Sequence, residues 1–497
     1  MIERGRELRG DVTLDADLVV VGTGAGGAMV AREAARAGLR VIALEEGAYS
    51  TPRDFTQRED EMLPLLFADA GARTTDDGAV QVLQGRGVGG STVHNTNLCK
   101  RAPAEVLDGW RIPGWSAADL APHYDVVEKD LSVTPLLESD LNRNNALLKR
   151  GVEKLGWRGG LLRHNRIGCV RSGFCELGCS FDAKQNALKV LIPEAAQAGA
   201  RVIADCRVER ITLDGARASG VVARALDGDG RAGPTVTVRA AVCLAGSAVG
   251  SAALALRSGL PHLERVGRTL RLHPGAAVAG IFDETIEGWL GIPQSYECTE
   301  KLRFDENAGP HDDRVWIVPA FAHPVGLAAA LPGFGAAHMR RMRLYPRLAV
   351  FVAMLHDRTR GTVSADGGRV RIRYALDRDD QRALSNGLAA CAELLLAAGA
   401  RTAVVPFASP LEITDRSQLR QIAARGYRPL DPLLTAVHPM GTLPLGSVVD
   451  ERGRWIDLRN LWVADGSLFP SSLGGPPQLT IYAAAHKIAG HLVRDLR

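Results

Sequence analysis

Three glycines and one carboxylate form the first chemically informative group in the sequence: Gly22, Gly24, Gly27 and Glu45. Gly22 permits a tight turn, Gly24 lets the backbone approach a pyrophosphate, and Gly27 allows close packing of a helix on a strand. A helix that starts here offers amide donors and the positive end of its dipole to that pyrophosphate. Glu45 would accept hydrogen bonds from ribose hydroxyls. The motif predicts a dinucleotide site, and by itself it leaves both NAD and FAD open.

The elements around this motif have the order that such a site needs. A β-branched run ends at Gly22, and an Ala- and Arg-rich segment with helical spacing follows over 28–37 until Gly38 stops it. A second apolar strand over 40–45 ends at Glu45. Together they predict a βαβ unit of about 30 residues.

Composition excludes several classes of protein. The chain has 497 residues, of which 46% are hydrophobic and 23% charged, so two or three globular domains with a large core are expected. A net charge of +4 without a basic tract argues against nucleic-acid binding. The charged N-terminus is not a signal peptide, and no apolar run is long enough to cross a membrane. With mostly scattered cysteines, these features predict a soluble cytoplasmic protein.

The rest of the chain reads as interleaved helices and strands without repeats. Residues 104–160 are predicted to be largely helical, and 200–245 to form four strands, at 201–204, 208–213, 219–225 and 235–244. Strand pairs such as 347–355 and 369–374 follow. An amphipathic helix is predicted over 377–398, with Gly399 as its stop, and a final helix over 480–495 after a short strand at 461–464.

A set of motifs in a fixed order makes the sequence resemble the glucose–methanol–choline (GMC) oxidoreductases, which are FAD-dependent. The matching blocks span the whole chain: Gly85–Asn95, Arg207–Ile211, Val242–Ser251, Val266–Pro274, Val437–Thr442, Leu461–Ser467 and Pro477–Ala483. In the first block the glycines leave room for a flat ring system against bare backbone. The resemblance favours FAD over NAD, because the C-terminal blocks would otherwise have no role.

The resemblance implies an α/β fold with a discontinuous, Rossmann-like FAD-binding domain and an interleaved substrate domain built on an antiparallel sheet. The FAD-binding domain is expected to comprise residues 1–100, 200–270 and 436–497. A helical or lid segment over 101–199 and a substrate domain over 271–435 are expected to make up the rest.

The resemblance also assigns the site residues. Beyond the first motif, the residues expected to bind FAD are Gly87, Gly90, Ser91, His94, Asn95, Val208, Asp465, Gly466, Pro477 and Gln478. Val208 matches a valine that contacts adenine, and Asp465 a residue near the ribityl chain and pyrophosphate. His94 matches a histidine that some family members attach covalently to the flavin. Covalent attachment and non-covalent lining both stay open for it.

His438 matches the active-site histidine of the family. Oxidation of an alcohol by flavin needs a base for the hydroxyl proton while the carbinol hydrogen leaves as hydride to flavin N5, and imidazole suits that role at neutral pH. The family adds a second His or Asn where this chain has Pro476, which offers no acid, base or donor. Ser471, Ser472 and Gln478 are the candidate substitutes.

Cys169, Cys175 and Cys179 form the one dense cysteine group. Their spacing matches neither zinc-finger nor ferredoxin patterns, so no metal site is predicted. The segment resembles the long-chain fatty alcohol oxidase branch of the family, which favours a loop or lid over the flavin or substrate.

The sequence therefore predicts FAD-dependent oxidation of an alcohol, of apolar or cyclic type, to a carbonyl, with His438 as base and oxygen or a quinone as electron acceptor. The apolar preference rests on the fatty-alcohol-oxidase likeness and on segments such as 325–334. The alternatives are a different flavin reaction, such as desaturation or another C–H oxidation, and a flavin-binding protein without catalysis. A different flavin reaction is kept as an alternative because Pro476 stands where the family has its second catalytic residue.

Overall fold

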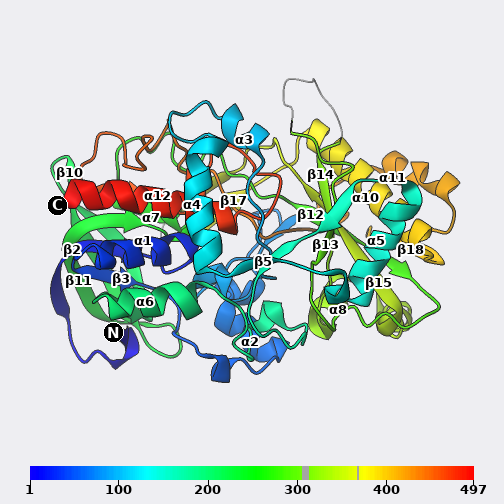
Figure 1. Cartoon of the computed structure of the whole chain (residues 1–497), viewed down its shortest axis with the longest axis horizontal. Helices are drawn as coiled ribbons and strands as arrows, with labels where there is room; N and C mark the ends of the chain where they lie inside the picture. The colour runs from blue at the N-terminus through cyan, green and yellow to red at the C-terminus, as the bar shows by residue number, and fades with distance from the viewer. Residues whose placement is uncertain (305–312, 367–368) are drawn as a thin grey trace.

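The computed structural model describes residues 1–304, 313–366 and 369–497. Its strands form two large sheets and two small two-stranded sheets. Figure 1 shows the two large sheets side by side along the long axis, with both chain termini at the end that holds the first sheet. In this view α4 (Ala117–Asp130) crosses between them.

The first sheet is parallel from β1 to β11 and continues with two antiparallel strands. Its order is β1 (Ile2–Arg4), β8 (Arg201–Ala204), β3 (Val41–Leu44), β2 (Val12–Val21), β11 (Ala232–Leu244), β10 (Arg217–Leu226) and β9 (Cys206–Asp214), and β21 (Leu461–Val463) also pairs with β11. Leu18, Val19 and Val20 of β2 are fully buried, as expected of a central parallel strand covered on both faces.

Helices from distant parts of the chain cover this sheet. α1 (Ala25–Arg36) contacts β2 and β3 and packs against the C-terminal helix α12 (Gln478–Leu496), which also contacts α4. α6 (Ile192–Gln197) contacts α1, and α7 (Ser247–Ser258) contacts β9. The first sheet and its cover are therefore assembled from the N-terminal, middle and C-terminal parts of the chain.

The second sheet is antiparallel except where β20 meets β4. Its order is β19 (Leu411–Ile413), β18 (Thr402–Val405), β12 (Gly275–Ile281), β15 (Leu348–Leu355), β14 (Val315–Pro319), β13 (Tyr296–Cys298) and β6 (Gly159–Leu161), and β20 (Leu434–Ala436) pairs with both β12 and β4 (Val80–Val82). α10 (Arg378–Ala398) packs against β12, β15 and α5 (Arg143–Leu155). The mixed α/β fold with an antiparallel second sheet confirms the predicted fold class.

The remaining elements are short. They are two antiparallel strand pairs, β5 (Val133–Pro135) with β7 (Arg163–Asn165) and β16 (Thr362–Asp366) with β17 (Arg369–Arg373), and the helices α2 (Glu59–Leu66), α3 (Ala104–Gly109), α8 (Pro324–Ala330), α9 (Gly335–Met342) and α11 (Arg420–Arg425). Of the helices in the three described stretches, none is both long and apolar enough to cross a membrane.

One predicted pairing is wrong. Both predicted strands exist, as β15 and β17, but they do not pair with each other: β15 lies between β12 and β14, whereas β17 pairs with β16. β16 and β17 are close in the chain, so a short local hairpin satisfies the backbone groups of β17 and leaves β15 to the sheet.

Candidate functional site

The N-terminus of α1 forms a cradle of bare backbone. Its N-cap, Gly24, has no side chain to pair with the first amides, and the first turn holds no acidic residue. A Cβ at Gly24 would have only the Cα of Gly90 near it, at 3.9 Å. At Gly26 and Gly27 a Cβ would instead collide with the carbonyl oxygens of Ala464 and Gly22, at 1.6 and 1.9 Å. The glycines thus bring β21 against the helix end and leave its amides open to an anion.

Glu45 ties the glycine turns together. Its buried carboxylate accepts hydrogen bonds from the amide and hydroxyl of Thr23 (3.0 and 2.8 Å) and from the amides of Gly47 (3.0 Å) and Gly87 (3.1 Å). Burial raises the pKa of this carboxyl, and these bonds lower it. The carboxylate therefore orders the turns at 22–24 and 85–87 in the structure. A further contact to a ribose stays a prediction.

His94 lies beside the second glycine segment and is 7% exposed. Its ring packs against Phe67 with centroids 3.9 Å apart, and its Nε2 is buried with no hydrogen-bond partner in the described part of the chain. Burial, with a smaller effect of Lys184, lowers the pKa of His94 to about 3, so the ring is neutral at pH 7. A buried neutral nitrogen without a partner is the kind of group that a bound ring system would satisfy.

Lys184 fixes the chain on both sides of His94. It is 2% exposed, and its Nζ donates to the carbonyl oxygens of Val93 (2.8 Å), Asn95 (2.5 Å) and Cys175 (3.0 Å). One ammonium therefore joins the cysteine segment to the segment that presents His94. Sequence reasoning assigned no role to this lysine, because nothing local shows that residues 93–95 lie next to it.

The C-terminal blocks meet the same cradle. Asp465 caps the turn at Gly466–Leu468 and accepts hydrogen bonds from Ser251 (2.6 Å) and from the amide of Ser467 (2.9 Å). Burial raises the pKa of Asp465, and these hydrogen bonds lower it. Gln478 accepts a hydrogen bond from Asn95 (2.7 Å), which ties the start of α12 to the His94 segment.

The other predicted cofactor residues lie in or around this assembly. Gly90 has a left-handed backbone and approaches Gly24, and Ser91 is exposed, its Oγ accepting from the amide of Gly85 at 2.8 Å. Pro477 is the N-cap of α12. Val208 is buried in β9, where it pairs with Ala223, so it belongs to the sheet core.

His438 follows β20 and pairs with a second histidine. Its Nδ1 lies 3.3 Å from Nδ1 of His273, which is 1% exposed, and the rings are nearly perpendicular, at 87°. Its neighbour Pro439 lies beside Gly466, whose Cβ would be 3.4 Å from the carbonyl oxygen of Pro439. The residue after His438 therefore lies against the block Leu461–Ser467, and Ala464 of that block packs against the start of α1.

No candidate substitute for a second catalytic group next to Pro476 is free. Ser471 accepts a hydrogen bond from the indole of Trp110 (2.8 Å), and Ser472, which is buried, donates to Asp357 (2.7 Å). The amide of Gln478 is used by Asn95 and by the carbonyl of Leu98. His356, which sequence reasoning missed, is buried nearby, 3.2 Å from where a Cβ on Gly474 would lie, and its Nδ1 has no hydrogen-bond partner within residues 1–304, 313–366 and 369–497.

The cysteine segment packs over the His94 region. Cys169, Cys175 and Cys179 are free and partly exposed, and Leu177 between them joins an apolar cluster with Phe67 and Val93. In the described parts of the chain, no group of three or more His, Cys, Asp or Glu side chains is arranged to hold a metal ion.

These residues fit a flavin dinucleotide. The α1 cradle suits a pyrophosphate, the bare glycines beside it leave space that a Cβ would fill, and the Nε2 of His94 has no hydrogen-bond partner among the residues that the structure describes. His438 follows β20 and precedes Pro439, which lies beside Gly466. The arrangement could hold the dinucleotide at the α1 cradle.

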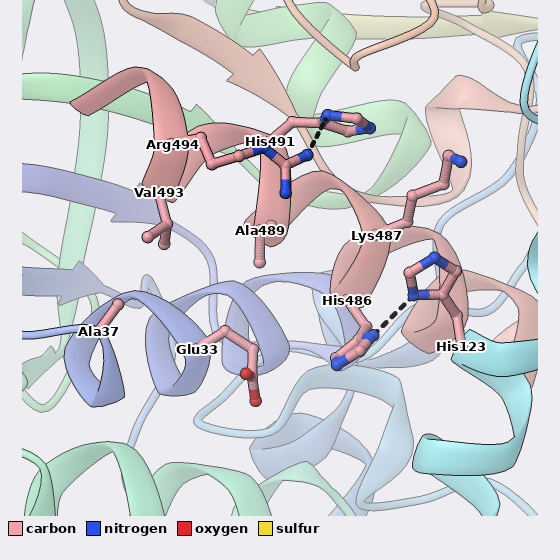
Figure 2. Close-up of a pocket in the computed structure, with 10 residues that line it drawn as sticks. Glu33, Ala37, His123, His486, Lys487, Ala489, His491, Val493 and Arg494 are labelled. Atoms are coloured by element: carbon pink, nitrogen blue, oxygen red, sulfur yellow. Dashed lines mark hydrogen bonds between the residues drawn. The ribbon is translucent and has the colours of Figure 1, made fainter. Parts of the chain in front are cut away.

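A separate hollow of about 560 Å³ lies over α12 and contains none of the predicted site residues. Figure 2 shows its lining side chains, with the dashed contacts of His123 to His486 (2.8 Å between Nδ1 atoms) and of Arg494 to His491 (2.8 Å). It is lined by one acid, Glu33, and by His123, His486, Lys487, His491 and Arg494 among others.

Buried histidines predict how stability depends on pH. Burial lowers the pKa of His94 and His273 to about 3 and of His164 to about 4, whereas in the unfolded chain the value is about 6.5. As pH falls below about 6.5 the unfolded state binds protons that the folded state refuses, so stability is lost, by up to about 1.4 kcal/mol per pH unit for each histidine. Urea unfolding between pH 7 and 5 measures the slope. His164→Gln should reduce it, because one of the buried histidines is then absent.

Comparisons with known proteins agree with this geometry. Family models described as GMC oxidoreductase match residues 63–275 and 357–485. An uncharacterised GMC-type oxidoreductase of Mycobacterium tuberculosis is 37% identical over 493 residues, covering 96% of this chain and 76% of that protein. A long-chain-alcohol oxidase of Arabidopsis thaliana is 27% identical, covering 98% of this chain and 69% of that protein.

Solved structures show the same fold. Pyridoxine 4-oxidase from Mesorbium loti superposes with a TM-score of 0.71 at 18% identity, covering 96% of this chain and 98% of that one. Formate oxidase from Aspergillus oryzae superposes with a TM-score of 0.70 at 16% identity, covering 98% and 100%. At this identity the likeness concerns the fold alone.

Proposed function

Since this chain belongs to the GMC oxidoreductase family, we propose that it oxidises an alcohol to a carbonyl compound with FAD as the hydride acceptor. The observation that carries the proposal is the His438–His273 pair, next in sequence to Pro439, whose carbonyl oxygen lies against Gly466 of the block that packs on the dinucleotide cradle. The proposal places residues 1–100, 200–270 and 436–497 in the FAD-binding domain.

Each part of the chain has a distinct task in this proposal. The α1 amides and the glycines at 87 and 90 bind the dinucleotide, and Glu45 orders their turns. The flavin, when bound, supplies the acceptor atom for the hydride. His438 meets the carbinol oxygen, and the tautomer of its ring decides whether it accepts a proton there, as the sequence predicts, or donates one.

The proposed substrate is an apolar alcohol with oxygen as electron acceptor. The relatives named as long-chain-alcohol oxidases support both points. The segment 325–334, which suggested an apolar substrate, forms α8 and the turn after it, and Phe334 in that turn is 93% exposed. It therefore adds no support, and the substrate proposal depends on the relatives and on the family.

A panel of alcohols tests the proposed function. Anaerobic mixing of the FAD-loaded protein with primary alcohols of increasing chain length should bleach the flavin and yield the aldehyde, faster with the longer chains because more apolar surface is buried. Return of the colour on adding air, with peroxide formed, identifies oxygen as acceptor. Bleaching that reverses only with a quinone would contradict the oxygen proposal.

We propose that His94 lines the flavin without a covalent bond, its Nε2 finding there the partner that it lacks in the protein. Precipitation of the yellow protein with acid should then leave all the colour in the supernatant. A yellow pellet from the native protein, and a colourless one from His94→Ala, would instead establish attachment at His94.

A different flavin reaction, such as desaturation, is the second candidate. It is favoured by the surroundings of Pro476, where Ser471, Ser472 and Gln478 are all engaged with other groups. FAD that stays oxidised with every alcohol, and is reduced by a substrate without a hydroxyl group, would favour this candidate.

A further inference from the structure

His273 lies next to His438, and contacts with Asp357 and Gly474 hold it in place. The carboxylate of Asp357 accepts hydrogen bonds from the amides of Leu272 (3.0 Å) and His273 (3.3 Å), and it is itself buried. Ser472 and Tyr374 donate to the same carboxylate. On its far side the His273 ring meets the chain at Gly474, which lies in the same turn as Pro476. These contacts hold both the ring and the backbone of His273 in one orientation.

The tautomer of His273 follows from its contact with Gly474. The amide of Gly474 donates to Nε2 of His273 at 2.9 Å, so Nε2 has a lone pair and no proton. Burial, helped by Arg271, keeps the pKa of His273 near 3, and the ring is neutral at pH 7. A neutral imidazole carries one N–H, and in His273 it must be Nδ1–H.

That N–H faces Nδ1 of His438 across 3.3 Å. If His438 also carried its proton on Nδ1, two N–H groups would point at each other, and the buried His273 would lose its hydrogen bond and keep an unpaired donor. Nδ1 of His438 must accept, and the proton of its neutral ring then lies on Nε2.

We infer that His273 is a positioning residue that fixes the tautomer of His438, so that His438 presents an Nε2–H donor, rather than a lone pair, to whatever binds in front of it. The step from this donor to catalysis rests on the proposed function. There the donor meets the carbinol oxygen and stabilises the negative charge on it.

The proton balance of the reaction changes accordingly. The O–H bond of the alcohol breaks with its proton passing to water, and the C–H bond then breaks with its electron pair going to the flavin, while the C–O bond becomes double. The alcohol loses two electrons, and the flavin gains them. His438 keeps its proton throughout, which separates this route from one in which it serves as the base.

Nitrogen NMR of the FAD-loaded protein tests the tautomer without any substrate. With ¹⁵N-labelled histidine, correlations from the ring protons show which nitrogens of each ring carry hydrogen, and the signals missing in His438→Ala assign His438. The expected result at pH 7 is Nε2–H on His438 and Nδ1–H on His273. A proton on Nδ1 of His438 would overturn the inference, whether or not any alcohol reduces the flavin.

Two substitutions at 273 separate tautomer control from packing. His273→Asn keeps an N–H on the side that faces His438, whereas His273→Leu removes it. The leucine variant should mix both tautomers of His438 and lower kcat about tenfold to a hundredfold with little change in KM, and the asparagine variant should recover most of the rate. Equal losses in both variants would show that His273 only fills space, and the inference would fall. Should the leucine variant not fold, the NMR result on the native protein decides.

The pH dependence of flavin reduction gives a second readout. If water takes the hydroxyl proton, the rate constant rises with pH through the neutral range, by up to about tenfold per pH unit, because ionised alcohol becomes more abundant. Burial already lowers the pKa of His438 well below its usual range, so with His438 as base the profile would be flat there, and a flat profile contradicts the inference.

Discussion

His438→Ala should lower the rate constant for reduction of the bound flavin by alcohol by about 10²–10⁴-fold, while FAD stays bound. His438 pairs with His273 and precedes Pro439, whose carbonyl oxygen lies against Gly466, and neither proposed role of its ring survives truncation to a methyl group. The cradle is built from other residues, at α1 and at 85–91, so the cofactor should not be lost. Anaerobic stopped-flow absorbance measures the rate, and the visible spectrum measures the flavin content.

His262→Ala is the matched control for this substitution. The His262 ring is partly exposed and pairs with Asp457 (2.9 Å), away from the glycine turns. Its loss should leave the rate unchanged within a factor of two or so. If His438→Ala retained most of the native rate, His438 would not contact the reacting carbon or oxygen, and the site assignment would be wrong.

Lys184→Met should cost about 2–4 kcal/mol of folding free energy and loosen FAD binding. Three carbonyls, of the buried Val93 and of the partly buried Asn95 and Cys175, share the ammonium of Lys184 and would lose their donor together. Two of them flank His94, so the segment expected to lie along the flavin would lose its fixed path. Urea unfolding and titration with FAD measure the two effects.

Lys189→Met controls for the loss of a lysine in the same region. The ammonium of Lys189 pairs with Asp182 (2.8 Å) at the surface, a contact worth about 1 kcal/mol or less. A Lys184→Met protein as stable as the Lys189→Met protein would mean that the carbonyls find water, and that Lys184 does not organise the His94 segment.

Local chemistry explains why some elements were predictable. α10 spans Arg378–Ala398, one residue from the prediction, because Asp377 caps its first turn and Gly399 adopts a left-handed backbone at its end. The strand–turn–helix order around Gly22 was likewise visible, since Gly27 is required by a contact within its own motif and Gly22 by a contact with Ala245 at the end of β11.

The parts that were not predictable depend on contacts between distant segments. Lys184 lies about 90 positions from the carbonyls of Val93 and Asn95, and His273 lies 165 positions from His438. Glu45 could be assigned to a ribose from its motif, but its four bonds to Thr23, Gly47 and Gly87 follow from the way that two glycine turns pack. No local pattern encodes such meetings, because tertiary packing decides them.

Isotopic substitution at the carbinol carbon tests the central claim, hydride transfer from an alcohol to bound FAD, most directly. The purified protein is loaded with FAD and mixed without oxygen with a long-chain primary alcohol, either unlabelled or carrying deuterium at the carbinol carbon. The account predicts that the flavin colour bleaches with both alcohols, and more slowly with the deuterated one because its C–D bond breaks in that step. FAD that binds firmly yet keeps its colour with every alcohol would contradict the account.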